Sequence, residues 1–220
     1  MAAENLLREH LRIQATMRMQ MTSGIRRGKK GFVDCAPAGA IVGICGTSFT
    51  TPGEALTKDE LKLLRAAVRR KRLPIKMCYG NSQYALLYDT SGALEYYEGF
   101  CSTGFFPFMH GWLVLNGKVI DLTLPADREK PRGLGLKNRI LGKIPAHTEY
   151  LGVPCTKEES RAATIENEYF GPLLDDYGRG WPLLHNIKNR WGITEKALEE
   201  FQAPVLPMMT RMKTLQQEVG

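Results

Sequence analysis

The segment that most constrains this chain is HGWLVLNGKVIDLT at residues 110–123, where two apolar runs flank Asn116 and Gly117. Asn-Gly between such runs is the strongest short hairpin signal, because both central residues of a type I′ turn need a positive φ. A two-residue loop at these positions pairs Leu115 with Lys118 and thereby sets every other pair. The sequence therefore predicts an antiparallel hairpin with a defined register.

The register decides which side chains share a face, because side chains alternate along a strand. One face of this hairpin is expected to carry His110, Trp112, Val114, Val119, Asp121 and Thr123. The opposite face is expected to carry Leu113, Leu115, Ile120 and Leu122. Since both faces are largely apolar, the hairpin is predicted to lie within a sheet that is covered on both sides.

Two ionisable residues on the first face need an explanation. The register makes His110 and Asp121 diagonal neighbours, about 7–8 Å apart at Cα and within reach of a side-chain hydrogen bond. A buried carboxylate is costly unless it is paired. An imidazole supplies that pairing, and the carboxylate in turn sets its tautomer. The pair is therefore either a satisfied core contact or part of a catalytic group.

A candidate nucleophile precedes the hairpin. Cys78 follows the helix-breaking Pro74 and lies at the start of a helix predicted over residues 77–89. The free N–H groups and the dipole of a first helical turn favour a thiolate and can hold a developing oxyanion. Gly80 would give a substrate room to approach. A buried, unreactive thiol is the alternative, since free cysteines commonly pack as small apolar residues.

The cysteine count bears on the compartment and on cofactors. The five cysteines are odd in number and form no CxxC motif, so free thiols in a reducing compartment are expected. No apolar run approaches the ~18 residues of a membrane helix, and the charged, amphipathic N-terminus is unlike a secretory signal. We predict a cytoplasmic protein with no membrane partner. The histidines and cysteines form no metal-ligand pattern, so no metal or organic cofactor is expected.

The basic character of the chain leaves a second function open. The net charge is +7 and the sequence pI is about 9.2. Basic residues concentrate in GIRRGKK at 24–30 and in DREKPRGLGLKNR at 127–139. Such segments can contact nucleic acid or an acidic protein, although the chain has no recognisable nucleic-acid-binding motif. The sequence does not define an oligomeric state.

Local signals predict the remaining elements. Capping boxes at Thr57 with Glu60 and at Thr156 with Glu159 begin two helices, the first extending to residue 72 with basic residues at the end that the helix dipole favours. The others are helices at 4–21 and 194–202, a strand at 93–100, a buried strand or irregular apolar loop at 38–55, and a basic loop at 126–143. One domain is expected over residues 1–220. Its catalytic core spans about 57–125, with N-terminal and C-terminal helices packed around it.

In chain order, MCYGNSQYAL, YYEGF and HGWLVLNGKVIDLT resemble the papain-like/transglutaminase-like cysteine hydrolase superfamily. They are most similar to small bacterial and phage members with a Cys-x-x-Asn helix, a Glu-Gly strand end, a His-x-Trp strand and an Ile-Asp-x-Thr strand. The resemblance covers residues 74–124. It implies an α+β fold in which helices pack on a central antiparallel sheet. It also implies Cys78 as nucleophile, His110 as general base and acid, and Asp121 as the group that orients His110.

Several positions depart from that pattern or have two interpretations. Residues 69–75 contain no glutamine to serve as an oxyanion donor, so Asn81 or a backbone N–H is the candidate. Tyr79 replaces the tryptophan that follows the cysteine in transglutaminases. Glu98 either binds substrate or caps a strand end. Trp112 is expected in the core, where it would shield the His110–Asp121 pair from water.

The sequence thus predicts a thiol-dependent hydrolase or acyl transferase that acts on an amide-type bond through a Cys-His-Asp triad. The substrate would be a peptide, an isopeptide, a glutamine side chain or a small amide. The alternative is an inactive binding protein of the same fold, which contacts nucleic acid or an acidic partner through its basic loops. Such binding would weaken steeply with salt and would not depend on Cys78.

Overall fold

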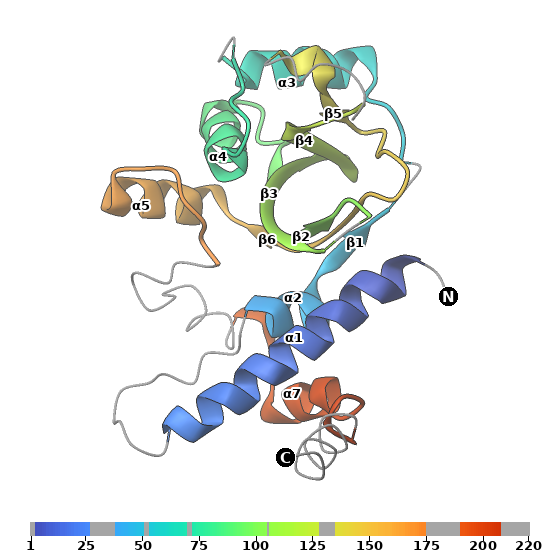
Figure 1. Ribbon diagram of the computed structural model, residues 1–220. Helices are drawn as coiled ribbons and strands as arrows, with labels where there is room; N and C mark the ends of the chain where they lie inside the picture. Colours follow the sequence, from blue (N-terminus) through green and yellow to red (C-terminus); the bar gives the residue numbers. More distant parts are fainter. Residues whose placement is uncertain are drawn as a thin grey trace.

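The computed structural model describes residues 3–26, 38–50, 53–69, 72–104, 106–127, 135–174 and 190–207 (Figure 1). Its centre is a curled, antiparallel six-stranded sheet with the strand order β1-β6-β2-β3-β4-β5. The strands are β1 (Thr47–Phe49), β2 (Glu95–Ser102), β3 (Phe108–Leu115), β4 (Lys118–Pro125), β5 (Arg139–Leu141) and β6 (Glu149–Cys155). The fold therefore combines helices with an antiparallel sheet, as predicted.

Helices pack on the sheet in two groups (Figure 1). The helices are α1 (Ala3–Arg26), α2 (Ala38–Cys45), α3 (Lys58–Ala67), α4 (Cys78–Tyr88), α5 (Lys157–Asn167) and α7 (Glu195–Gln202), with a short 3-10 helix η1 (Leu136–Asn138). In Figure 1, α3 and α4 lie above and to the left of the curl, while α1, α2 and α7 lie together below it. Within the described residues, no helix has the length and apolar character needed to cross a membrane.

The predicted hairpin is confirmed in its turn and its register. Asn116 and Gly117 have φ values of 51° and 76°, as a type I′ turn requires. Leu115 pairs with Lys118, and the pairing continues inward from there through β3 and β4. The turn therefore sets the pairing of the three residues on each strand that lie next to it.

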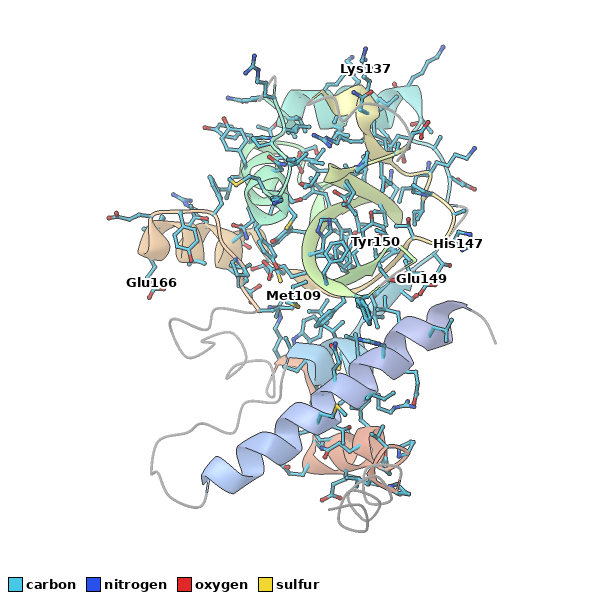
Figure 2. The ribbon with its side chains drawn as sticks, viewed as in Figure 1. Met109, Lys137, His147, Glu149, Tyr150 and Glu166 are labelled. Carbon is cyan, nitrogen blue, oxygen red and sulfur yellow. The ribbon has the colours of Figure 1, made fainter. Side chains whose placement is uncertain are left out.

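The two faces of the hairpin contact different parts of the core. Leu113, Leu115, Ile120 and Leu122 pack with residues of α3 and α4. Trp112, Val114 and Val119 pack inside the curl, where the Tyr150 side chain also lies (Figure 2). The sheet is thus covered on both faces at this point, in agreement with the sequence-based expectation.

Both capping boxes are confirmed, but the helix that begins after Thr57 is shorter than predicted. The Thr57 hydroxyl accepts the Glu60 N–H, and the Glu60 carboxylate accepts the Thr57 N–H. Helix α3 ends at Ala67, with Val68 as its C-cap, so the predicted end at residue 72 is wrong; residues 70 and 71 of the basic run lie outside the described residues. Leu73 is buried in the core and accepts a hydrogen bond from Arg139 through its carbonyl group. These tertiary contacts hold the chain in place soon after α3 ends.

Two other segments were misassigned from the sequence. Residues 38–45 form α2 rather than a strand or loop, and Gly43 lies so close to Phe201 that an added Cβ would be 2.5 Å from its ring. The segment 126–143 was predicted as loop but contains β5, and β6 was not predicted. Helix α2 is buried against neighbours, so its residues show little of the periodicity that marks a surface helix.

Candidate active site

Cys78 is the first residue of α4, as the sequence predicts. Met77 occupies the N-cap position without a side-chain hydrogen bond, and the first backbone bond runs from the Asn81 N–H to the Met77 carbonyl. Helix α4 lies against β3, where the Ser82 hydroxyl donates to the Gly111 carbonyl over 3.2 Å. That contact holds the start of the helix beside His110. In any α-helix, the N–H groups of the first turn have no carbonyl group of the same helix to bind.

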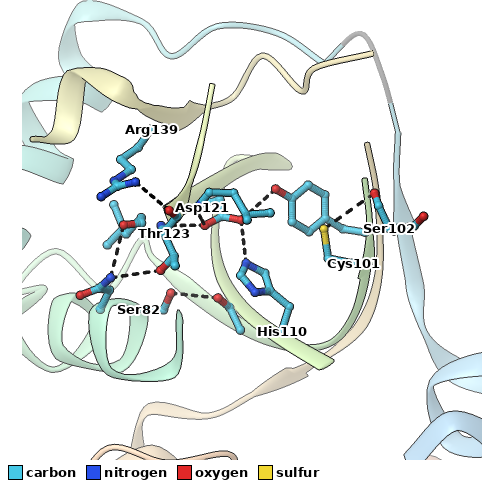
Figure 3. A network of polar contacts seen from close by, with 12 residues as sticks. Ser82, Cys101, Ser102, His110, Asp121, Thr123 and Arg139 are labelled. Atoms are coloured by element: carbon cyan, nitrogen blue, oxygen red, sulfur yellow. Dashed lines mark hydrogen bonds and ion pairs between the residues drawn. The ribbon is translucent and has the colours of Figure 1, made fainter. Parts of the chain in front are cut away.

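His110 and Asp121 form the contact that the hairpin register predicts. The His110 Nε2 atom lies 2.7 Å from the Asp121 Oδ2 atom (Figure 3), and both side chains are buried. With Nε2 committed to the carboxylate, the Nδ1 atom is the ring nitrogen left for a third partner. Cys78 lies close enough to the ring to help raise the pKa of His110, and the two residues line the same cavity. The structure therefore brings together all three residues proposed as a triad.

The charges of the pair reinforce one another. Burial lowers the pKa of His110, but the Asp121 charge and hydrogen bond, together with Cys78, outweigh it and raise that pKa to about 10. Burial raises the pKa of Asp121, while the His110 charge and the hydrogen bonds to the carboxylate bring it below its usual value. Each ionised group therefore stabilises the other, and the imidazolium–carboxylate form is favoured.

Asp121 has further donors that fix its orientation. Its Oδ1 atom accepts the backbone N–H groups of Thr123 and Leu124, each over 2.8 Å. The Tyr150 hydroxyl donates to Oδ2 over 2.9 Å, the same oxygen that binds His110. Tyr150 comes from β6, a strand missed in the sequence, so its role was missed as well. Nothing local to residue 150 indicates this contact.

Arg139 is a second functional neighbour that the sequence did not reveal. Its guanidinium is buried and donates to the Thr123 carbonyl over 2.7 Å and to the Leu73 carbonyl over 2.6 Å (Figure 3). Burial lowers the pKa of Arg139, whereas the charge of Asp121 raises it. Arg139 thus ties the end of β4 to the chain before α4 and adds a positive charge near the Asp121 carboxylate.

Asn81 was predicted as a possible oxyanion donor, but its amide has other partners. The Nδ2 atom lies 2.9 Å from the Pro74 carbonyl and 3.0 Å from the Thr123 hydroxyl oxygen. Both N–H groups are therefore engaged within the protein, where they join the turn before α4 to β4. The other donor that the sequence predicts for an oxyanion beside Cys78, a backbone N–H group, stays a prediction.

Glu98 lies apart from the triad and within the core. Its carboxylate accepts the backbone N–H groups of Leu173 and Leu174, the Tyr96 hydroxyl and the Gln83 amide. Burial raises the pKa of Glu98 to about 7 even though these hydrogen bonds lower it. The side chain is fully buried and does not line the cavity beside Cys78. These contacts give Glu98 a structural role and do not present it to a substrate.

Trp112 lies beside the imidazole of His110, and Tyr79 lies against the neighbouring Gly111. The Trp112 ring is buried and stacked with the imidazole, with ring centroids 6.4 Å apart and planes 16° from parallel. It therefore separates His110 from solvent on the inside of the curl, as predicted. Tyr79 lies against Gly111, where an added Cβ would be 2.9 Å from the Tyr79 ring. A glycine at 111 thus allows α4 to approach β3 beside the catalytic candidates.

A cavity of about 340 Å³ lies beside the thiol and the imidazole. Residues of three segments line it: Ile75, Lys76 and Cys78 before and at the start of α4, 108–110 in β3, and 123–125 in β4. The cavity places Cys78 and His110 in one wall. A carbonyl group held there would be close to the sulfur and to the N–H groups of the first helical turn.

The remaining predictions concern cofactors, basic loops and related proteins. In the described part of the chain, no group of three or more His, Cys, Asp or Glu side chains is arranged to hold a metal ion. Residues 27–30 and 128–134 of the two basic segments lie outside the described residues, and Arg139, at the end of the second segment, is buried. No family model, curated protein or solved structure matches the chain.

Proposed function

We propose that this protein is a thiol-dependent hydrolase or acyl transferase that acts on an amide-type carbonyl. One observation carries the proposal: His110, hydrogen-bonded to Asp121 through Nε2, lines the same cavity as Cys78 at the start of α4. A core His–Asp pair with no chemical role would not require a half-buried thiol on the remaining side of the ring. Nucleophile, base and orienting group in this order are the components of a catalytic triad.

The chemistry follows from the geometry of these groups. The reactive form pairs a Cys78 thiolate with the His110 imidazolium, and the sulfur attacks the carbonyl carbon to form a tetrahedral oxyanion, which the N–H groups at the start of α4 stabilise. Collapse breaks the carbon–nitrogen bond, and the imidazolium gives its proton to the departing amine. Water or an acceptor amine, deprotonated by His110, then attacks the thioester carbon. The carbon–sulfur bond breaks, the acid or the new amide leaves, and the Cys78 thiolate and the His110 imidazolium are restored. Asp121 holds the ring in place throughout these steps.

The arrangement also supports placement in the papain-like/transglutaminase-like superfamily. The candidate cysteine begins a helix, and the candidate histidine and aspartate lie on adjacent antiparallel strands. The same order of elements underlies the similarity of MCYGNSQYAL, YYEGF and HGWLVLNGKVIDLT to that superfamily. We infer membership from this combination. Because no glutamine precedes Cys78, we expect a specificity different from that of papain and of the transglutaminases.

Selective alkylation of the native protein tests the proposal. Brief treatment with iodoacetamide, followed by peptide mapping, should modify Cys78 at least about tenfold faster than the other four cysteines. Cys45 is the matched control, because it is also half-buried, although burial raises the pKa of its thiol. His110→Ala should remove the advantage of Cys78. Equal labelling of Cys78 and Cys45 in the wild-type protein would contradict the proposal.

Acyl transfer itself needs a second measurement. With p-nitrophenyl acetate, wild-type protein should release one equivalent of p-nitrophenolate in a burst and gain an acetyl group on Cys78. Cys78→Ala should lose the burst, while Cys45→Ala should retain it. A burst that persists in Cys78→Ala would rule out the assigned nucleophile. The inactive binding protein considered above would show neither the burst nor any dependence on Cys78.

A further inference from the structure

The walls of the cavity beside Cys78 are mainly apolar. Ile75 contributes from the turn before α4, Phe108 from the start of β3, and Leu124 from the end of β4. The Phe108 ring also meets the imidazole of His110 edge-on, with centroids 5.6 Å apart. Cavities of this size, about 340 Å³, accept a substantial organic group. The reacting carbonyl would therefore enter together with an apolar neighbour.

Exposed apolar side chains gather around the same cavity. Two lining residues, Ile75 and Phe108, are 40% and 38% exposed although both are large hydrophobes. Scattered exposed hydrophobes are ordinary, but a concentration beside a pocket marks a binding site. The rim thus offers apolar surface that a substrate can cover.

The charges at the cavity discriminate among substrates. Of the described residues that line it, Lys76 is the only charged group besides His110, and none is a carboxylate. Lys76 adopts a left-handed conformation, with φ of 63°, two residues before the thiol. A basic substrate side chain would meet two positive groups. An acidic side chain would meet no repulsion, but its carboxylate would lose its hydration against the apolar walls.

We propose that the substrate of Cys78 is a peptide-like acyl donor with an apolar side chain, branched aliphatic or aromatic, beside the carbonyl that is attacked. This inference rests on the thiol chemistry proposed above. Ile75, Phe108 and Leu124 contact the apolar side chain, and Lys76 disfavours basic ones. The expected order of reactivity is apolar first, then acidic, then basic. A glutamine side chain, polar and uncharged, fits these walls poorly.

Three N-acetyl aminoacyl p-nitrophenyl esters, those of leucine, glutamate and lysine, test this order. Acylation is followed by p-nitrophenolate release and by the mass of the thioester on Cys78, with Cys78→Ala giving the background. The leucine donor should react about tenfold faster than glutamate and about a hundredfold faster than lysine, differences of ~1.4 and ~2.8 kcal/mol. Equal rates for the three donors would overturn the proposal.

Two variants assign the preference to particular residues. Phe108→Ala should reduce the advantage of the leucine donor about tenfold, because it removes one apolar wall. Lys76→Glu should make the lysine donor react faster than the glutamate donor. Lys196→Glu is the matched control: it makes the same charge change on α7, where the side chain is 83% exposed, and should keep the original order. If Lys76→Glu behaves like Lys196→Glu, the assignment is wrong.

Iodoacetamide labelling separates the two proposals. This reagent is small and uncharged, so its reaction with Cys78 reports on the thiol and not on the apolar walls. Fast, His110-dependent labelling combined with equal acylation by all three donors would refute the substrate class and leave the thiol chemistry intact. Unselective labelling of Cys78 would refute both.

Discussion

Two buried carboxylates, Asp121 on β4 and Glu98 on β2, illustrate how different surroundings give the same chemical group different uses. Asp121 faces a histidine that also contacts a thiol at an open cavity. Glu98 is surrounded by neutral donors, including the N–H groups of Leu173 and Leu174, and has no contact with the cavity. Burial depth does not separate them, since both are fully buried.

The difference lies in the charge of the partner. A cationic partner compensates for desolvation, so the pKa of Asp121 falls below its usual value. Four neutral donors compensate only in part, so burial dominates at Glu98 and raises its pKa to about 7. A buried carboxylate is therefore a stronger candidate for catalysis when its partner can itself exchange a proton with a nucleophile.

Asp121→Asn should have the largest effect on activity. The amide cannot stabilise the imidazolium or hold the correct tautomer, and such a change lowers turnover by about 10⁴-fold in a serine triad. We expect acylation of Cys78 by the leucine ester to fall by ~10³ to 10⁴-fold. Glu98→Gln is the comparison variant, and its acylation rate should fall by less than about tenfold. Equal losses of acylation rate in the two variants would contradict the different roles assigned to the two carboxylates.

Glu98→Ala should have the largest effect on stability. Removing the carboxylate leaves four buried donors without their acceptor, each worth about 1–3 kcal/mol when unsatisfied. We expect the free energy of unfolding in urea to fall by at least ~3 kcal/mol. A loss below about 1 kcal/mol would show that water replaces the carboxylate and that this region is open to solvent.

The two carboxylates should influence pH-dependent stability with opposite signs. The folded-state pKa of Glu98 is raised to about 7 from 4.5, so its contribution is complete below pH 4.5 and is lost as pH rises through 7. A shift of that size is worth on the order of 3 kcal/mol. Glu98→Gln should flatten the decline in unfolding free energy between pH 4.5 and 7. An unchanged slope in this variant would contradict the raised pKa.

Asp121 should affect the free energy of unfolding at the acidic end of the pH range. Because its folded-state pKa is lowered from 3.8, its contribution is present above that value and is lost as pH falls through the lower folded-state value. His110 adds stability below pH 6.5 that is lost as pH rises through about 10. Histidine NMR should show His110 protonated well above pH 7. Asp121→Asn should move this transition to lower pH, and an unmoved transition would contradict the pairing.

Tyr150→Phe should have the smallest effect. It removes one hydrogen bond to the Oδ2 atom of Asp121 while the bond from His110 remains. Net loss of one hydrogen bond to a charged group is worth about 1.5–3 kcal/mol, so we expect acylation to slow by about tenfold. With fewer donors, the carboxylate attracts the His110 proton more strongly, and the His110 transition should move to higher pH. A shift to lower pH would contradict this role for Tyr150.

Sequence reasoning was most successful where the signal is local. The Asn-Gly turn sets a register within a few residues, and capping boxes act within one helical turn. The contact between His110 and Asp121 followed from that register because diagonal neighbours on one face are close. By contrast, the expectation for Asn81 did not anticipate its contacts with Pro74 and Thr123, which form only when α4 packs on β4.

The sequence by itself determined the hairpin, the helix start at Cys78, and the placement of His110 beside Asp121, because each depends on backbone geometry over short distances. Only the tertiary structure decided that Tyr150 and Arg139 support Asp121, that Glu98 anchors the chain at Leu173, and that an apolar cavity lies beside the thiol. These contacts join residues far apart in the chain, and their free energy depends on burial and on the charge of the partner. Neither quantity exists until the helices pack on the curled sheet.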